Sequence, residues 1–557
     1  MNEQTPQTTQ ERHAARWSSL KTERASWDGH WKEISTHLLP RSGRFLVSDT
    51  NKGGKRHNNI LDSTGSEALD ILAAGMMAGM TSPARPWFRL ATPDADLNKS
   101  PAVKLWLSQC TRLMLDVFAK SNTYRALHTA YTELGSFGTA SNIMMPDFKT
   151  VIHSYPLTTG EFCIAQNWKG EPDTLYREFQ KPVGNLVSEF GIENVSMLAR
   201  QLWNKNQLDA KITVIHAIEP RQDRDSRKRD SLNMPWSSVY FEPSEKTKVL
   251  RESGYRQFPA LAARWATAGG DVYGHSPGMN ALGDIKQLQH QQLRKAQAID
   301  FKSNPPLQVP GSLKNQDIDR LPGGITYVDQ TSTNNAVRSM FEVNLDLSHM
   351  LADIQDVRTR IRAAFKADLF LMLANSTNTT MTATEVAERH EEKLLMLGPV
   401  VERLHSELLD PLIEITFSQM VEAGIVPPPP PELEGMDLKV EFVSMLAQAQ
   451  RAIATNGIDR YIGNLGQVAS FKPDVLDKFN ADEWADGYGD MLGVDPQFIV
   501  SNDKVALIRA DRAKAAQAQQ QAAMAEQMAG AAQKLGTVQT DTGNAGNDIM
   551  KQFSGYT

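Results

Sequence analysis

The chain has 557 residues, too many for one compact domain and enough for about three or four structural units. Its 41% hydrophobic and 22% charged residues are typical of a folded protein with real cores. The formal charge of −6 argues against a protein that coats nucleic acid by bulk electrostatics, because phosphate binding needs clustered Lys and Arg. A weak or sliding contact with DNA remains compatible with this charge.

The cysteines and the apolar segments indicate in which cellular compartment the protein is expected. Cys110 and Cys163 are too few for a disulfide framework or a four-thiolate zinc site, so we expect both to be small buried apolar residues. The N-terminal stretch "MNEQTPQTTQERHAARW" lacks the apolar segment of a signal peptide. The longest apolar run, Ile71 to Met80, is about half the roughly 20 residues that a spanning helix needs. We therefore expect neither secretion nor a membrane span.

The first half of the chain mixes helices with short strands. Helical spacing of Trp and Leu predicts one or two amphipathic helices from Arg12 to Leu39. A second helix is expected from about Ser63 to Met80, where Gly75 and Gly79 are spaced for close helix approach. Residues 100–280 alternate helical stretches with strand-like runs such as "KITVIHAIEP", which indicates an α+β fold, mainly helical over the whole chain. The mixed charges of Arg221 to Asp230 favour a solvated hairpin loop over a nucleic-acid patch.

Two long helices are predicted to flank a segment rich in proline and glycine. The first runs from Gly278 to Lys302, and the second from about Asp346 to Ala374 with apolar residues three and four apart throughout. Between them, "SNPPLQVPGSLKNQDIDRLPGGITYVDQ" indicates turns and short strands.

A polar run, "NSTNTT", then precedes an unusually long helical pattern from Thr382 to Ala423. Gly398 with Pro399, and Pro411, interrupt this pattern, and each proline removes a backbone donor and should kink the helix. A proline run ends it, and the strand "MDLKVEFVS", shorter helices and a final Ala, Gln and Met-rich helix follow. The last twenty or so residues, rich in Gly, Thr and Asn, are expected to be disordered.

The stretch "MTATEVAERHEEK", residues 381–393, concentrates charged groups but fits no catalytic or metal site. Leu394 stands where the zinc-protease pattern H-E-x-x-H needs a second histidine, and Ala387 stands where a di-iron motif needs Glu. Thr382 and Glu385 instead form T-x-x-E, the capping box of a helix start. We interpret the stretch as the beginning of the long helix.

No nucleotide-binding motif is complete. "GGDVYGHS" has Gly269 and Gly274 at the spacing of a phosphate-binding loop, but His275 replaces the required lysine. No Cys and His pair has a recognisable family spacing. We expect no enzyme and no cofactor.

Four stretches carry a family resemblance: "LDSTGSEALDILAAGMMAGMTSPARPWFRL", "YGHSPGMNALGDIKQLQHQQLRKAQA", "TATEVAERHEEKL" and "LKVEFVSMLAQAQ". In this collinear order, over about residues 12–500, the chain resembles the portal, or head-to-tail connector, proteins of T7-like short-tailed bacteriophages. Portals of this family are rings, usually of twelve subunits, at one capsid vertex, and DNA passes through their central channel. The loop before Met381 and the far C-terminus diverge from the pattern.

The resemblance implies a role for each part of the chain. Residues 1–277 would form most of the wing, 278–302 the first stem helix, 303–344 the clip and 345–374 the second stem helix. Residues 375–381 would form the tunnel loop, 382–449 the kinked wing helix with its return strand, 450–535 the crown, and 536–557 a disordered tail.

The same resemblance implies the functional residues. The tunnel loop facing DNA would be Asn375, Ser376, Thr377, Asn378, Thr379 and Thr380, uncharged residues that suit transient contact; a plain exposed loop is the alternative. Charged side chains off the apolar stripe of the second long helix would line the channel, namely Arg358, Arg360, Arg362 and Lys366. Many strong phosphate contacts would hold DNA rather than let it slide, so a channel of mixed sign is sensible.

The implied partners are further copies of the chain, double-stranded DNA bound without sequence preference, the large terminase subunit and a tail adaptor. Major capsid, scaffolding and internal core proteins complete the set. The resemblance places the protein in the virion after assembly in the host cytoplasm. Two other classes stay open from the residues: another ring component of the phage neck or tail, such as an adaptor, and a nucleic-acid enzyme.

Overall fold

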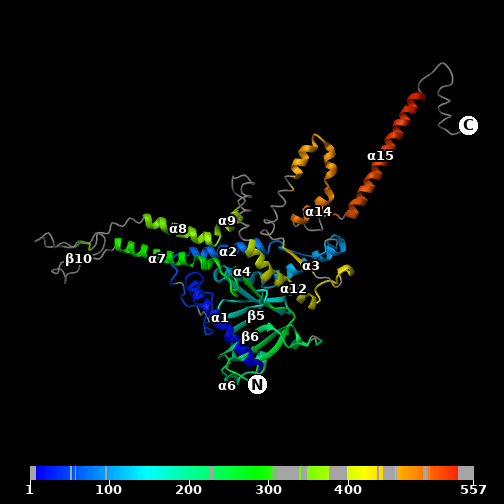
Figure 1. Cartoon of the computed structure of the whole chain (residues 1–557). Coiled ribbons are helices and arrows are strands. Elements are labelled where there is room, and N and C mark those ends of the chain that lie inside the picture. Colours follow the sequence, from blue (N-terminus) through cyan, green and yellow to red (C-terminus); the bar gives the residue numbers. More distant parts are fainter. Residues whose placement is uncertain are drawn as a thin grey trace, which may run out of the picture. The chain divides into compact units, whose positions relative to one another are not determined.

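The computed structural model describes residues 8–49, 53–56, 58–94, 97–225, 227–228, 230–303, 307–308, 338–339, 348–375, 398–433, 435, 438–442, 458, 461–492, 500 and 502–536. The chain divides into two compact units. One comprises Met1–Lys99 with Trp106–Asp459, and the other Ser100–Leu105 with Arg460–Thr557. Helices and antiparallel sheets both contribute, which confirms the expected α+β class (Figure 1).

Helix α1 (Thr9–His37) is one continuous helix rather than two. Its start is fixed by a capping box, because Thr8 Oγ1 accepts from Glu11 N while the Glu11 carboxylate accepts from Thr8 N. Trp17, Leu20 and Trp31 recur on its buried side. The sequence prediction of a helix ending before Pro40 is confirmed.

The larger sheet has five antiparallel strands in the order β4-β5-β6-β7-β8. They are β4 (Phe162–Gln166), β5 (Pro172–Pro182), β6 (Lys211–Pro220), β7 (Trp236–Phe241) and β8 (Arg251–Tyr255). The charged segment 221–230, with the short helix η2 (Ser231–Asn233), connects β6 to β7 as the predicted hairpin loop.

Alternate residues of this sheet enter two separate cores, as the period of a strand requires. Ile215 and Phe241 lie on the α1 side with Trp17 of α1. Val214 and Tyr240 belong to the opposite core, which is covered by α5 (Val183–Phe190) and α6 (Met197–Asn204). Cys163 lies in the first core, and both cysteines are buried, as expected.

Strand β4 is an edge strand, yet its backbone groups are covered from outside the sheet. Arg24 of α1 donates through Nη1 to the carbonyl oxygens of Gly160 and Phe162, at 2.9 Å each. The Ile164 N–H donates to Tyr273 Oη at 3.2 Å. Such covering prevents the exposed edge from pairing with another strand.

The smaller sheet has the order β3-β2-β9, with β2 (Thr139–Asp147), β3 (Val151–Leu157) and β9 (Ala260–Arg264). Helix α4 (Thr123–Phe137) leads into β2 through Gly138, whose φ of +81° and close approach to the Gly274 carbonyl leave no room for a side chain. Also in this part of the chain are α2 (Thr64–Met80), η1 (Leu97–Lys99) and α3 (Pro101–Lys120).

A two-stranded sheet joins distant parts of the chain. Strand β1 (Phe88–Ala91) pairs antiparallel with β12 (Lys439–Phe442), and the short helix η5 (Pro431–Leu433) precedes β12. Arg89 and Glu441 form an ion pair across it at 2.7 Å. The strand predicted in "MDLKVEFVS" is therefore present.

The second unit contains η6 (Pro473–Lys478), α14 (Ala481–Leu492) and α15 (Asn502–Gly536). Arg509 of α15 forms a two-pronged ion pair with Asp482 of α14, with both N to O distances 2.6 Å. The predicted Ala, Gln and Met-rich helix is confirmed, whereas the tail expected to be disordered lies outside the described residues from 537 on.

Candidate functional site

Two long helices occupy the segments for which the family resemblance implies a stem. Helix α7 (Pro277–Ser303) and helix α8 (Ser348–Ala364) lie side by side (Figure 1). The α7 bounds confirm the helix predicted from Gly278 to Lys302. Leu282, Ile285 and Leu288 of α7 are buried, but Leu293 and Ile299, on the same predicted stripe, are 44% and 45% exposed. The described residues therefore cover only the first half of the stripe.

The segment between the two helices falls mostly outside the described residues. Strands β10 (Leu307–Gln308) and β11 (Arg338–Ser339) pair antiparallel within it. This pairing agrees with the short strands predicted there, and the extent of the clip, 303–344, stays a prediction.

Arg358, predicted to line a channel, is held by Asp62 at the start of α2. The Asp62 Oδ2 atom accepts from Arg358 Nη2 at 2.7 Å and Nε at 3.1 Å, and from Gln292 of α7 at 2.8 Å. Gln289 of α7 joins the cluster, because its Oε1 accepts from Asp62 N while its Nε2 donates to Asp62 O. Burial alone would raise the pKa of Asp62, but hydrogen bonds from Thr64 and Arg358 outweigh it and lower the pKa below its usual value. Asp62 thus ties α2, α7 and α8 together.

The other two predicted channel arginines of α8 differ in whether they have carboxylate partners. Arg360 lies 3.4 Å from Asp284 of α7 and 3.5 Å from Asp356 of its own helix. Arg362 is exposed, and no carboxylate among the described residues lies within ion-pair distance of it. Of the predicted channel arginines, Arg362 is therefore the one whose charge is not balanced locally.

The second long helix is broken, which corrects the prediction of one helix from Asp346 to Ala374. Helix α8 ends at Ala364, and α9 (Ala367–Asn375) begins after a turn in which Lys366 has a φ of +55°. The turn buries Phe365 completely while the next helix buries Phe370. The 3/4 spacing continues across the turn, so periodicity alone does not reveal the break.

Helix α9 packs on the glycine face of α2. A Cβ atom at Gly75 would lie 2.2 Å from Cγ of Phe370, so only glycine allows this approach. The expected role of Gly75 in close helix packing is confirmed.

The predicted loop residues are mostly beyond what the structure describes. Asn375, predicted to open the tunnel loop, is the last residue of helix α9 instead. Ser376, Thr377, Asn378, Thr379 and Thr380 lie outside the described residues, as do Thr382 and Glu385 of the expected capping box. Their roles stay predictions.

The long helical pattern resumes at Gly398 as three consecutive segments. These are α11 (Gly398–Leu404), a π-helical turn η4 (His405–Leu409) and α12 (Asp410–Glu422). Gly398 and Pro399 start α11, and Pro411 lies in the first turn of α12, directly after the π turn. Proline cannot donate to the carbonyl four residues earlier, and a widened turn accommodates its ring. The kinks themselves stay predictions.

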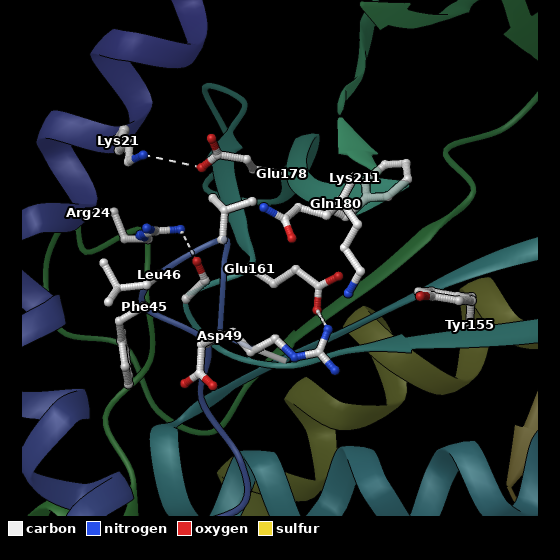
Figure 2. Close-up of a pocket in the computed structure, with 14 residues that line it drawn as sticks. Lys21, Arg24, Phe45, Leu46, Asp49, Tyr155, Glu161, Glu178, Gln180 and Lys211 are labelled. Atoms are coloured by element: carbon white, nitrogen blue, oxygen red, sulfur yellow. Dashed lines mark hydrogen bonds and ion pairs between the residues drawn. The ribbon is translucent and has the colours of Figure 1, made fainter. Parts of the chain in front are cut away.

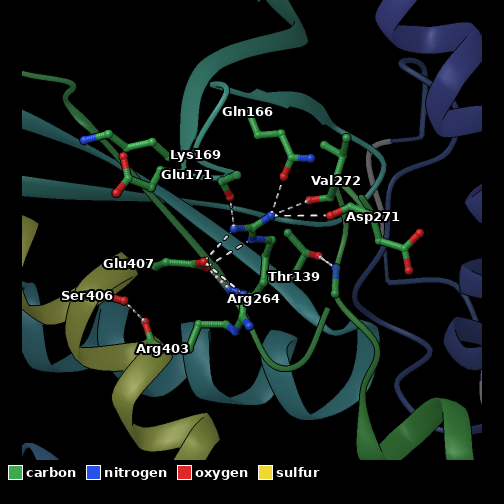
Figure 3. A network of polar contacts seen from close by, with 12 residues as sticks. Thr139, Gln166, Lys169, Glu171, Arg264, Asp271, Val272, Arg403, Ser406 and Glu407 are labelled. Carbon is green, nitrogen blue, oxygen red and sulfur yellow. Dashed lines mark hydrogen bonds and ion pairs between the residues drawn. The ribbon is translucent and has the colours of Figure 1, made fainter. Parts of the chain in front are cut away.

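A buried ion pair fixes this π turn to the smaller sheet (Figure 3). Arg264 of β9 lies 2.6 Å from Glu407 of the π turn, and their side chains are 3% and 10% exposed. Arg264 also donates to Gln166 Oε1 at 2.9 Å and to the Gly170 carbonyl at 2.6 Å. One guanidinium group therefore connects the π turn, strand β9 and the β4–β5 turn.

Sequence reasoning missed Asp62 and the Arg264–Glu407 pair. Asp62, two residues ahead of Thr64 at a helix start, carries a weak capping signal. Nothing local marks Arg264, because its partner is 143 residues away.

Across the residues that the structure describes, no group of three or more His, Cys, Asp or Glu side chains could hold a metal ion. In the same residues, no helix is long and apolar enough to cross a membrane.

A family model and two known phage proteins match this chain over most or nearly all of its length. A family model described as bacteriophage head to tail connecting protein matches residues 10–500. A probable portal protein of Bordetella phage BPP-1 is 64% identical over 544 residues, 98% of each chain. The portal protein of Salmonella phage epsilon15 is 45% identical over 541 residues, 97% of each chain. A solved chain from the virion of a native gene transfer agent particle has a TM-score of 0.36 and 11% identity, covering 83% of this chain and 98% of its own. The chain belongs to the family of bacteriophage head-to-tail connecting proteins, and it is a phage portal protein.

Proposed function

We propose that identical copies of the chain close into a ring, of twelve subunits as the family resemblance implies, through which double-stranded DNA is packaged and ejected. The observation that carries the proposal is the uncovered apolar surface of the α7–α8 pair. Leu293, Ile299 and Phe301 of α7 are 44%, 45% and 54% exposed, and Leu351 of α8 is 49% exposed. Several exposed apolar side chains on one helix pair favour an interface there, and a ring repeats one heterologous interface until it closes.

The charges on the helix pair suit a conduit. Among the predicted channel arginines of α8, Asp62 balances Arg358, and Asp284 with Asp356 balances Arg360, which leaves Arg362 to face phosphate. Few free cations per subunit give weak contacts that allow DNA to slide, whereas many would hold it. Lys366, in the turn between α8 and α9, is the second candidate contact.

The remaining partners follow from the role. The ring would dock the large terminase subunit during packaging and a tail adaptor afterwards, both at the segment between α7 and α8. Major capsid and scaffolding proteins would surround it at one vertex, with internal core proteins at the C-terminal helices. ATP hydrolysis would reside in the terminase, and this chain would catalyse nothing. Assembly in the host cytoplasm would precede its place in the virion.

Negative-stain electron microscopy and native mass spectrometry of the purified protein test the ring. We expect particles with a central hole, and we expect Ile299→Asp to reduce their number because it places a charge in the proposed interface. Leu198→Asp is the matched control, since Leu198 on α6 is similarly exposed, at 52%, on another surface. A monodisperse small monomer of the wild-type protein would contradict the proposal.

A further inference from the structure

An unusually exposed tryptophan occupies the turn between β4 and β5. Trp168 is 90% exposed, and Lys169 lies beside its ring at 5.4 Å from the centroid. Tryptophan is among the residues that contribute most to protein interfaces, because it combines a large apolar ring with a single N–H donor.

The turn that presents Trp168 is held rigidly. Asn167 Oδ1 accepts from the backbone N–H groups of Lys169 and Glu171 at 2.8 and 3.1 Å. Arg264 donates hydrogen bonds to Gln166 and Gly170, on the two sides of the turn (Figure 3). Binding through a turn that is already ordered loses little conformational entropy.

A pocket of about 210 Å³ lies at the opposite end of the same two strands (Figure 2). Phe45, Leu46 and Tyr155 supply apolar wall, and Lys21 and Arg44 supply cations. Figure 2 shows the Glu161 carboxylate among the side chains that line this space.

Glu161 supplies an acceptor that its own chain does not use. Its side chain is 6% exposed, and Arg44 approaches its Oε2 atom at 3.6 Å. Its Oε1 atom is buried without a hydrogen-bond partner among the described residues. A buried acceptor of this kind is costly unless something donates to it.

An indole side chain matches these three features of the pocket, namely its apolar wall, its cations and the Glu161 acceptor. Its ring can occupy the apolar wall, and its face attracts Lys and Arg cations. Its Nε1–H is a donor only, which is what Glu161 Oε1 requires.

Trp168 cannot enter the pocket of its own chain. Strand β4 has five residues between the pocket end and the turn, a span of about 17 Å at roughly 3.3 Å per residue. A second copy can place its Trp168 there, and a knob and a pocket at opposite ends of one hairpin form a heterologous contact that can repeat around a ring.

We propose that Trp168 of one subunit inserts into the pocket at Glu161, Phe45 and Leu46 of the next copy. This contact rests on the proposed ring and would be a second interface beside that of the helix pair. The occupant of the pocket is then another copy of the same chain and not a different virion protein.

Disulfide cross-linking tests the contact in the full-length protein. We expect the double variant Trp168→Cys with Leu46→Cys, after mild oxidation, to give a ladder of covalent multimers on a denaturing gel. Both positions are exposed, at 90% and 70%, and the native Cys110 and Cys163 are buried, so neither should interfere. The matched control pairs Leu46→Cys with Phe148→Cys, because Phe148 is also a highly exposed aromatic residue, at the β2–β3 turn. This control variant should remain monomeric.

Truncation gives a second measurement. Trp168→Ala should raise the protein concentration at which half of the rings have dissociated to about tenfold or more above the wild-type value, as expected for an interface hot spot. Phe148→Ala should leave this concentration unchanged. Intact rings without a ladder, or a disulfide within one chain, would overturn the Trp168 contact and leave the ring standing. Absence of rings in the wild-type protein would overturn the ring itself.

Discussion

Individual polar residues show most clearly where sequence reasoning stops. Arg358 was predicted to face a channel because it lies off the apolar stripe, yet it pairs with Asp62, which is 296 residues away. Periodicity tells which side of a helix a residue occupies but not which distant carboxylate meets it. Buried partners such as Arg264 and Glu407 are invisible for the same reason.

A buried histidine makes the stability of the larger sheet depend on pH. His216 of β6 is fully buried, stacks on Tyr240 with ring centroids 3.8 Å apart, and lies 3.0 Å from Ser238 Oγ. Burial lowers its pKa well below 6.5, and the nearby Arg177 and Arg251 act in the same direction. The His216 side chain is therefore neutral in the folded protein.

Below pH 6.5 the unfolded chain takes up a proton on His216 and the folded chain does not. The contribution of the buried neutral His216 to the free energy of unfolding is therefore complete above pH 6.5 and is lost as the pH falls. We expect His216→Phe to flatten the decline in unfolding free energy by at most about 1.4 kcal/mol per pH unit, reached about one pH unit below 6.5, where the unfolded histidine is almost fully protonated. Urea denaturation at several pH values measures it. His128→Gln, at an exposed position of α4, is the control, and an unchanged slope in His216→Phe would contradict the assignment.

At the scale of elements, periodicity predicted the long helices well but not their interruptions. The bounds of α1, α2 and α7 agree with the apolar spacing. The missing donor of Pro411 predicts an interruption, and the structure has a π turn directly before it, whereas no residue type marks the break at Lys366. Phe365 and Phe370 are both buried only because the chain turns between them.

The contact of α9 with α2 leads to a prediction about two helical glycines. Gly75→Ala would place a methyl group against Phe370, and we expect a net loss of about 1–2 kcal/mol because overpacking exceeds the gain in helix propensity. Gly283→Ala on α7, where nothing lies within 4 Å of the added Cβ, should instead stabilise by about 0.5–1 kcal/mol. Thermal unfolding of both variants measures this difference, and equal effects would show that the α2–α9 contact is not tight.

For the whole molecule, the sequence predicted the α+β class, the order of the elements and the portal family, because these depend on local pattern and on long matching words. It did not predict how the charge of the helix pair is distributed, since that depends on contacts between α2, α7 and α8. Arg362 is singled out among the predicted channel arginines only after the partners of Arg358 and Arg360 are accounted for.

Arg362→Gln should therefore weaken the binding of double-stranded DNA to purified rings and reduce its salt dependence, because one phosphate contact per subunit is lost. Arg360→Gln is the matched control, since Arg360 already has two carboxylate neighbours and should matter less. A salt titration of DNA binding distinguishes them. Equal losses in both variants would indicate that net charge, rather than position, governs the contact.

The covered edge of strand β4 has a consequence for how copies of this chain can recognise one another. A bare edge would accept any strand, including that of a misfolded copy, and would propagate into fibrils. Because Arg24 and Tyr273 already occupy the carbonyl of Phe162 and the N–H of Ile164, strand addition there is closed. Contact at this edge is left to side chains of defined shape, which can tell a correctly folded neighbour from any other.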